Sequence, residues 1–163
     1  MKKIGLLSDT HGFLDDEIID FFDACDEIWH AGDIGNLAVA DKLSQKKPFK
    51  AVYGNIDGQE VRVVYPKIQS FLCEQVHVLM IHIGGYPQKY EKEVRTIIQN
   101  AHVDLFISGH SHILKVMYDK KNELLHINPG AAGKFGMHKY QTAVRFIIDG
   151  KNIKELEVFE KKR

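Results

Sequence analysis

Carboxylate, amide and imidazole side chains follow five short apolar segments of this chain, one group after each segment. The candidate residues are Asp9, His11, Asp33, Asn55, His82, His110 and His112. Ligands of open α/β sheets bind at the carboxyl ends of strands, so side chains that follow successive strands meet at one edge. The repeated placement therefore predicts one shared site. Nitrogen and oxygen donors without a thiolate favour Mn, Fe, Zn or Ni over Ca or Mg, which prefer oxygen alone.

The number of candidate ligands indicates two metal ions. Seven ligands are too many for one ion with an open position, whereas two ions that share a carboxylate can use them all. Asp9 and His11 are two residues apart, as are His110 and His112. In an extended segment this spacing would direct both side chains of a pair to the same side. Two divalent cations, less the charges of Asp9, Asp33 and one hydroxide, leave about one positive charge, which suits an anionic phosphate oxygen.

Each candidate also has an explanation that needs no metal. A lone Asp or His at a strand end is more often a turn former, a helix cap or a hydrogen-bonded core residue than a ligand. The alternative is strongest for His82, because residues 82–85 could be a strand end that enters a glycine loop. His30 either orients a ligand or is a hydrogen-bonded core histidine. The other histidines are expected to lie outside the site: His77, His102, His126 and His138.

The elements that must position these residues change character along the chain. Apolar residues at helical spacing predict helices over 14–25, from an N-cap at Asn36 through Leu43, and over 90–100. Later segments predict strands over 113–118, 123–128, 142–148 and 153–159, with hairpin turns at 120–122 and 149–152. An α/β half followed by a meandering β half predicts two sheets packed face to face with helices outside.

Length and composition restrict the class of protein. The 163 residues can bury a sizeable core, and residues 1–163 are expected to form a single domain. Zero net charge and the lack of a basic tract predict no nucleic-acid surface. Two isolated cysteines, Cys25 and Cys73, fit neither a disulfide framework nor a Cys-type zinc site. No apolar run is long enough for a signal peptide or a membrane span, so a cytoplasmic protein without a membrane partner is expected, and a homo-oligomer is left open.

The combined motifs resemble those of the calcineurin-like metallophosphoesterases: D-x-H, G-D, G-N-[HD], a strand-end His and G-H-x-H. Their order and spacing are most similar to the small bacterial and archaeal phosphodiesterase branch, and the resemblance extends from Lys3 to Phe159. Residues 128–130 are similar to an N-P-G loop near the metals of that branch. The resemblance implies an α/β fold, a two-sheet β-sandwich flanked by helices in four αββα layers.

The resemblance also implies a role for each candidate ligand. The first metal would be held by Asp9, His11 and His112, and the second by Asn55, His82 and His110, with Asp33 bridging the two. In this family two divalent ions, here expected to be Mn with Fe, Zn or Ni as alternatives, activate a bridging hydroxide that attacks phosphorus in line. Asp33, Asn55 and His82 are the residues expected to act in catalysis.

Two positions depart from the family pattern. Many members have a histidine after the asparagine, where this chain has Ile56, and an aliphatic side chain cannot protonate a leaving group. Asp57 could substitute, but Asp57-Gly58 is also a good turn pair, and the turn is favoured. Many members also have His-Gly-His where this chain has His82-Ile83-Gly84-Gly85, so a second histidine is missing from the pocket.

These features predict a metal-dependent phosphoesterase that acts on a small phosphate ester and prefers diesters to monoesters. A doubly charged monoester with a poor leaving group depends strongly on proton donation, whereas a diester with a good leaving group can react with metal electrostatics alone. The alternative is a non-catalytic, metal-containing interaction module resembling the small retromer subunit, which has this fold and an impaired metal site. All seven ligand positions here keep competent side chains, which favours the enzyme.

Overall fold

Sheet A contains the first three apolar segments as parallel strands. In the computed structural model, which describes residues 1–163, these are β1 (Lys2–Leu7), β2 (Glu27–His30) and β3 (Phe49–Ala51). On its other side β1 pairs antiparallel with β11 (Tyr140–Asp149), and β12 (Asn152–Lys162) forms the outer edge. All four residues of β2 are buried, as expected of a strand that is covered on both faces.

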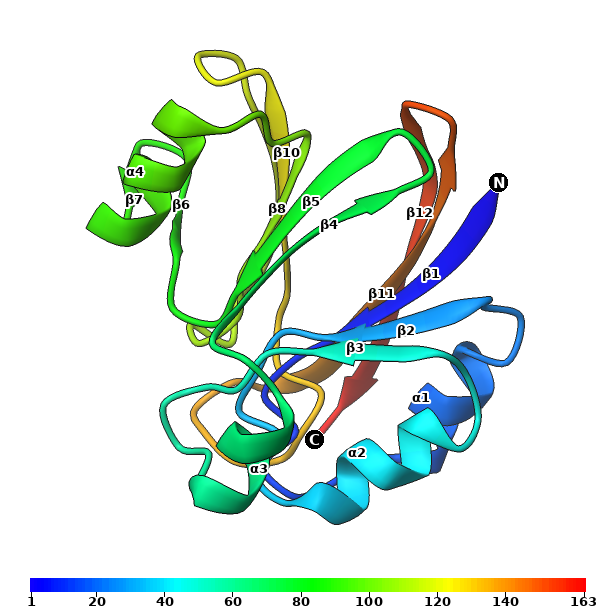
Figure 1. Ribbon diagram of the computed structural model, residues 1–163. Helices are drawn as coiled ribbons and strands as arrows, with labels where there is room; N and C mark the ends of the chain where they lie inside the picture. Colours follow the sequence, from blue (N-terminus) through cyan, green and yellow to red (C-terminus); the bar gives the residue numbers. More distant parts are fainter.

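Sheet B is built around three parallel strands of the later sequence. They are β5 (Val76–Ile81), β8 (Leu105–Ile107) and β10 (Leu124–Pro129), flanked by antiparallel β4 (Ile68–Cys73) and β9 (Leu114–Asp119). A small hairpin of β6 (Gly85–Tyr86) and β7 (Lys89–Tyr90) follows β5. The parallel strands of both sheets have their carboxyl ends toward the same end of the sandwich, so the loops that follow them can converge there (Figure 1).

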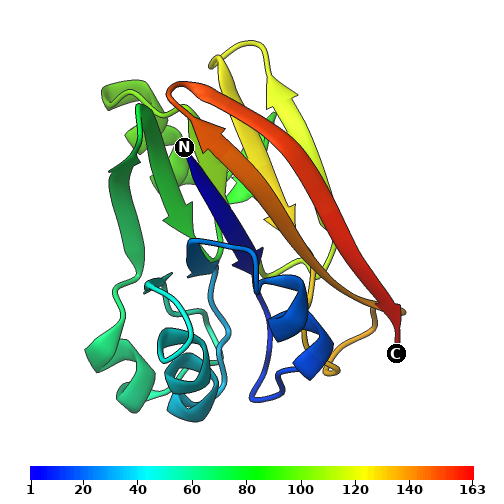
Figure 2. The same cartoon turned by 90° about the vertical axis from the view of Figure 1, so that its right-hand side faces the viewer.

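Three apolar cores separate four layers, which can be followed in Figure 1, and Figure 2 shows β12, β11 and β1 of sheet A side by side. The central core lies between the sheets and includes Trp29, Met80 and Phe146. A second core packs α1 (Asp16–Phe21) and α2 (Leu37–Ser44) on the outer face of sheet A, and a third packs α4 (Lys92–Asn100) on the outer face of sheet B. This αββα arrangement confirms the predicted fold class. No helix has the length and apolarity needed to cross a membrane.

The element boundaries correct the sequence prediction in several places. The first helix ends at Phe21 rather than residue 25, because the chain turns there to enter β2. The last begins at Lys92, because residues 89–90 pair with the preceding hairpin strand. Asn36 caps α2 as predicted, with its Oδ1 accepting the Val39 N–H at 3.2 Å. The sequence prediction missed β4 and the six-residue α3 (Gln59–Val64). The four later strands and both hairpin turns that it predicted are present.

Candidate metal centre

The structure brings all seven predicted residues together at the carboxyl ends of strands from both sheets. Loops after β1, β2 and β3 carry the residues of sheet A: Asp9, His11, Asp33 and Asn55. Loops after β5 and β8 carry those of sheet B: His82, His110 and His112. The site therefore lies where the ends of the two sheets meet.

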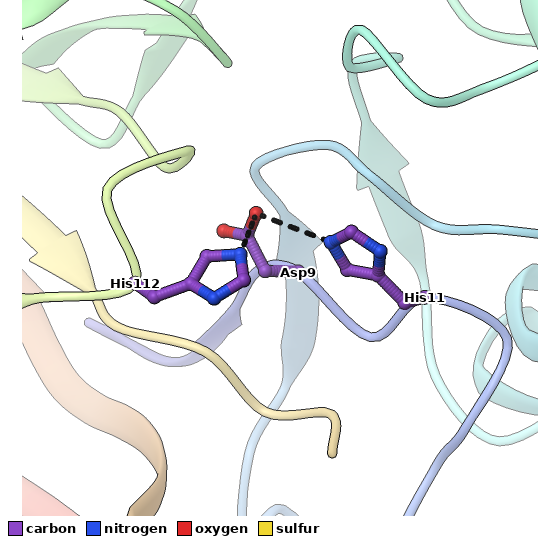
Figure 3. Close-up of side chains that lie close together, drawn as sticks. All are labelled: Asp9, His11 and His112. Atoms are coloured by element: carbon purple, nitrogen blue, oxygen red, sulfur yellow. Dashed lines mark ion pairs between the residues drawn. The ribbon is translucent and has the colours of Figure 1, made fainter. Parts of the chain in front are cut away.

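Asp9, His11 and His112 form the first group of potential ligands (Figure 3). The Asp9 Oδ1 atom lies 3.2 Å from the His112 Nε2 and 3.8 Å from the His11 Nε2. One donor atom from each residue lies within 4.8 Å of the others. The grouping matches the set that the family resemblance implies for the first metal.

Asp33, His82 and His110 form the second group, again with donor atoms within 4.8 Å of one another. Asn55 joins them, because its Oδ1 lies 3.0 Å from the His110 Nδ1. The Asp33 Oδ2 atom is 3.2 Å from the His82 Nε2 and 3.4 Å from the His11 Nε2. One carboxylate oxygen thus faces both groups, as a shared ligand must.

The donor atoms of this site are left without partners by the protein itself. Asp9 Oδ1, His11 Nε2 and His82 Nε2 are buried and make no hydrogen bond. An unsatisfied buried polar group costs about 1–3 kcal/mol, so three of them in one place require an explanation. Cations held between these carboxylates and imidazoles would satisfy all three, and the nitrogen and oxygen donors fit divalent transition metals.

Each of the two carboxylates has one oxygen that accepts hydrogen bonds from neighbouring groups and one that faces the imidazoles. The Oδ2 of Asp9 accepts hydrogen bonds from the Ser8 hydroxyl at 2.7 Å and the His110 N–H at 3.1 Å. The Oδ1 of Asp33 accepts the Ile56 N–H at 3.0 Å. Burial raises the pKa of both carboxyls, but the nearby imidazoles, His11 and His112 for Asp9 and His82 for Asp33, outweigh it and lower both pKa values. Both are therefore ionised at neutral pH, as metal binding requires.

The loop backbone differs from the extended conformation that was predicted for the paired ligands. Five ligands have left-handed φ angles: Asp9 (55°), His11 (46°), Asp33 (55°), His110 (70°) and His112 (59°). Such a conformation costs of the order of 1 kcal/mol for a residue with a Cβ, and it concentrates at functional sites. The side chains converge because the loops turn, and hydrogen bonds such as Asp9 N–H to Gly32 O at 2.9 Å hold the turns together.

Two glycines allow the ligand loops to approach one another closely. A Cβ on Gly54 would overlap the Asp33 carboxylate, and one on Gly109 would overlap the Ser8 hydroxyl. The Asn128 side chain holds the loop after β8 in place by donating a hydrogen bond to the Gly109 carbonyl at 2.9 Å. The N-P-G segment therefore supports the ligand loop after β8, in agreement with its resemblance to a loop near the metals.

His30 lies behind the centre and is a hydrogen-bonded core histidine, one of the two predicted alternatives. Its Nε2–H donates to the Thr10 hydroxyl at 2.9 Å, whose own hydrogen goes to the Ile34 carbonyl, and its Nδ1 accepts the Gly32 N–H at 3.1 Å. Burial lowers the pKa of His30 to about 4, so the ring is neutral. It joins the loops after β1 and β2 through Thr10 and Gly32.

Asp57 is committed to backbone hydrogen bonds, which supports the turn interpretation over that of a proton donor. Its carboxylate accepts the N–H groups of Gly54 and Gly35, both at 2.8 Å, and of Ile34 at 3.1 Å. Arg62 of α3 donates to the Asp57 carbonyl at 2.6 Å. The sequence prediction missed α3, and with it this arginine, because the helix buries only Val61 and shows no periodic pattern.

His138 contacts a predicted ligand, although the sequence placed it outside the site. Its Nε2–H donates to the Gly133 carbonyl at 2.8 Å, so its Nδ1 can accept the Nδ1–H of His112 at 3.2 Å. Burial lowers the pKa of His138, which favours the neutral ring. This contact leaves the His112 Nε2 lone pair on the side of the Asp9 Oδ1, where it could bind a metal ion. No local pattern in the sequence marks the residue.

His138→Ala should weaken metal binding to the Asp9 group about 10-fold, because partners that orient a metal ligand contribute 10–100-fold to affinity. Calorimetric metal titration measures the change. His138→Gln, which can still accept from His112, is the matched control and should recover part of the affinity. Unchanged affinity in a folded His138→Ala variant would mean that His112 is oriented without it.

A two-sheet αββα sandwich with carboxylates and imidazoles at its strand ends is the architecture of a metal-dependent phosphoesterase. The sequence model of one family, the calcineurin-like phosphoesterase superfamily domain, matches residues 1–151. The chain therefore belongs to the calcineurin-like phosphoesterase superfamily, whose members use divalent metals.

Relatives and solved structures agree with this assignment. A probable metallophosphoesterase of Methanothermobacter thermautotrophicus is 28% identical over 133 residues, which cover 78% of this chain and 76% of that protein. An archaeal phosphodiesterase structure superposes with a TM-score of 0.76 at 22% identity, covering 96% of this chain and 99% of the other. Vps29 of Chaetomium thermophilum superposes with a TM-score of 0.77 at 14% identity, covering all of both chains. These two structures, each below 25% identity, show the shared fold.

Proposed function

We propose that this protein is a dinuclear metal-dependent phosphoesterase that prefers phosphodiesters. The proposal depends on one observation, the Asp33 Oδ2 that faces both His11 and His82 across a site with three unpaired donor atoms. Seven side chains would hold two divalent ions, for which Mn is the first choice and Fe, Zn and Ni the alternatives. When bound, such ions supply Lewis-acid chemistry and a nucleophile near neutral pH.

The side chains at the open face of the centre would position the phosphate ester. Asn55 and His110 are exposed, whereas Asp9, Asp33 and His82 are buried. The buried carboxylates fix the negative charge of the site, and the exposed amide and imidazole lie where phosphoryl oxygens would approach. Ile56 is beside them, and its side chain can neither donate nor accept a proton. A substrate with a good leaving group is therefore favoured.

Two cavities adjoin the exposed face and support the preference for diesters. One, of about 260 Å³, is lined by Ile83, Tyr86, His110 and Lys115 among others. The other, of about 650 Å³, lies between His110 and the loop that contains His138. His110 lines both, so a phosphate placed there could extend one substituent into each cavity. A monoester has only one substituent to place.

A metal-reconstituted screen of phosphomonoesters, phosphodiesters and cyclic nucleotides tests the proposed function. We expect turnover of aryl diesters, with a higher kcat/KM than for the matched monoesters. Full metal occupancy without turnover of any ester would contradict the proposal. That outcome would favour the non-catalytic interaction module.

Ile56→His should raise kcat/KM toward alkyl phosphomonoesters relative to aryl diesters about 10-fold or more, because a general acid typically contributes ~10²–10⁴-fold. Ile56 as a residue is 44% exposed and lies in none of the apolar cores, so an imidazole fits without disturbing a core. The hydrogen bond from the Ile56 backbone N–H to the Asp33 Oδ1 does not depend on the Ile56 side chain. Rates at several pH values, with metal content measured in parallel, show the effect.

Ile56→Asn is the matched control, since it adds polarity without a group that titrates near neutral pH. An equal change in both variants, or unchanged relative rates in a fully metallated Ile56→His protein, would exclude proton donation. The diester preference would then come from the cavities.

A further inference from the structure

A second cluster of metal-ligand side chains lies at the opposite end of sheet B. It consists of His77, His102 and Asp104, whose donor atoms lie within 4.8 Å of one another. The Asp104 Oδ1 is 2.8 Å from the His102 Nε2, and its Oδ2 is 3.2 Å from the His77 Nδ1. The rings of the two histidines meet edge to face, with centroids 5.1 Å apart. Two imidazoles and one carboxylate thus converge from segments 25 residues apart in sequence.

The backbone fixes the carboxylate of this cluster in place. Asp104 precedes β8, and its N–H donates to the His77 carbonyl of β5 at 2.9 Å. Its Oδ2 accepts the His77 N–H at 2.8 Å, and its carbonyl accepts the Leu125 N–H of β10 at 2.9 Å. Three neighbouring strands therefore hold one ligand rigidly. His102, in the connection from α4 to β8, has the most exposed side chain of the three.

The charge of Asp104 has no permanent cationic partner. Its only ionic contacts are with His77 and His102, and no lysine or arginine lies within ion-pair distance. Burial raises the pKa of Asp104, but hydrogen bonds from the His77 backbone and ring and from His102 outweigh it and lower the pKa. The carboxylate is therefore ionised at neutral pH. The three side chains are 52%, 68% and 31% exposed for His77, His102 and Asp104, so water can reach the remaining positions around an ion.

We propose that His77, His102 and Asp104 form a separate site for a single transition-metal ion of the Zn²⁺, Ni²⁺ or Cu²⁺ class. Two imidazoles and a carboxylate suit these ions, and solvent supplies the remaining ligands. His77, in β5, and His82, directly after it, are five residue steps apart, about 16 Å at ~3.3 Å per step, so this site is independent of the dinuclear centre. A bound ion would connect the α4–β8 segment to β5. The inference does not rest on the proposed function.

Zn²⁺ titration of the metal-reconstituted protein and of a His102→Ala variant tests the site. The variant should bind one Zn²⁺ ion fewer than the unaltered protein, whatever number the dinuclear centre holds. In the unaltered protein, Zn²⁺ should also shift the imidazole ¹⁵N resonances of His77 and His102. Both readouts are independent of turnover, so the proposed function can fail without affecting them.

Matched variants complete the experiment. Asp104→Asn keeps an acceptor for the His77 N–H but loses the charge, and should weaken Zn²⁺ binding about 10-fold or more. Lys151→Ala, at an exposed turn position, should bind as the unaltered protein does. Equal Zn²⁺ stoichiometry in the His102→Ala and unaltered proteins, or imidazole resonances of His77 and His102 that do not move, would overturn the proposal. Because His102 is largely exposed, its replacement leaves the cores untouched.

Discussion

Asp33→Ala should lower turnover of an aryl phosphodiester by at least about 10³-fold and leave the two-sheet fold intact. The Asp33 Oδ2 is the carboxylate oxygen nearest to both His11 and His82, at 3.4 and 3.2 Å from their Nε2 atoms, whereas the Asp9 Oδ1 lies 3.8 Å from each. Loss of Asp33 should therefore affect both halves of the centre. Loss of a single preorganised transition-state donor costs ~10²–10³ in turnover, and removal of a shared ligand should cost more. The measurements are metal content, kcat and thermal unfolding of the purified variant.

The fold should survive because the contribution of Asp33 to stability is local. Its side chain makes one hydrogen bond to the backbone, from the Ile56 N–H at 3.0 Å, and its left-handed φ of 55° costs alanine of the order of 1 kcal/mol. Asp33→Asn separates the two effects, since asparagine tolerates that conformation and can accept the same hydrogen bond, yet carries no charge. Turnover should fall in both variants.

Asp20→Ala is the control for loss of a carboxylate, because Asp20 is exposed on α1 and belongs to neither ligand group. It should keep full metal content and turnover. Near-stoichiometric metal together with near-normal diesterase activity in Asp33→Ala would show that Asp33 does not bridge. The centre would then have to share a different ligand.

The composition of the centre could be predicted from sequence because of a property of parallel strands. Their carboxyl ends lie at one edge of a sheet, so an Asp, Asn or His directly after each apolar run is brought to the same place without knowledge of the packing. The two packed sheets with helices outside were predicted from the change of an α/β half to a β half, and the four αββα layers from the family resemblance. The meeting of the ligand residues at one edge needs only the local pattern and the strand direction, which is why it could be predicted.

Contacts between distant loops could not be predicted in this way. His138 contacts His112 because the loop before β11 lies against the ligand loop after β8. No periodic pattern in the sequence indicates that two such distant loops meet. His77 and His102 were expected to lie outside the predicted site, and their meeting at Asp104 depends on the pairing of β5 with β8. The left-handed ligand loops escaped prediction because D-x-H and G-H-x-H spacing is compatible with several backbone paths.

His112→Ala and His110→Ala should each abolish a different metal site. The His112 Nε2 faces the Asp9 Oδ1 at 3.2 Å, whereas the His110 Nδ1 faces the Asn55 Oδ1 at 3.0 Å. Because partners that only orient a ligand already contribute 10–100-fold to affinity, removal of a ligand itself should weaken one ion about 10²-fold or more. Metal titration of each variant should show one intact site and one weakened site.

A second substitution identifies which site each variant has lost. His11 belongs to the same group as His112, so His11→Ala added to His112→Ala should remove no further ion. Added to His110→Ala, it should remove the remaining ion, because the two changes then affect different groups. Residues that share a site are non-additive, whereas independent sites add. If both double variants retain the same single ion, then His110 and His112 serve one metal, and the division of the G-H-x-H motif between two centres is wrong.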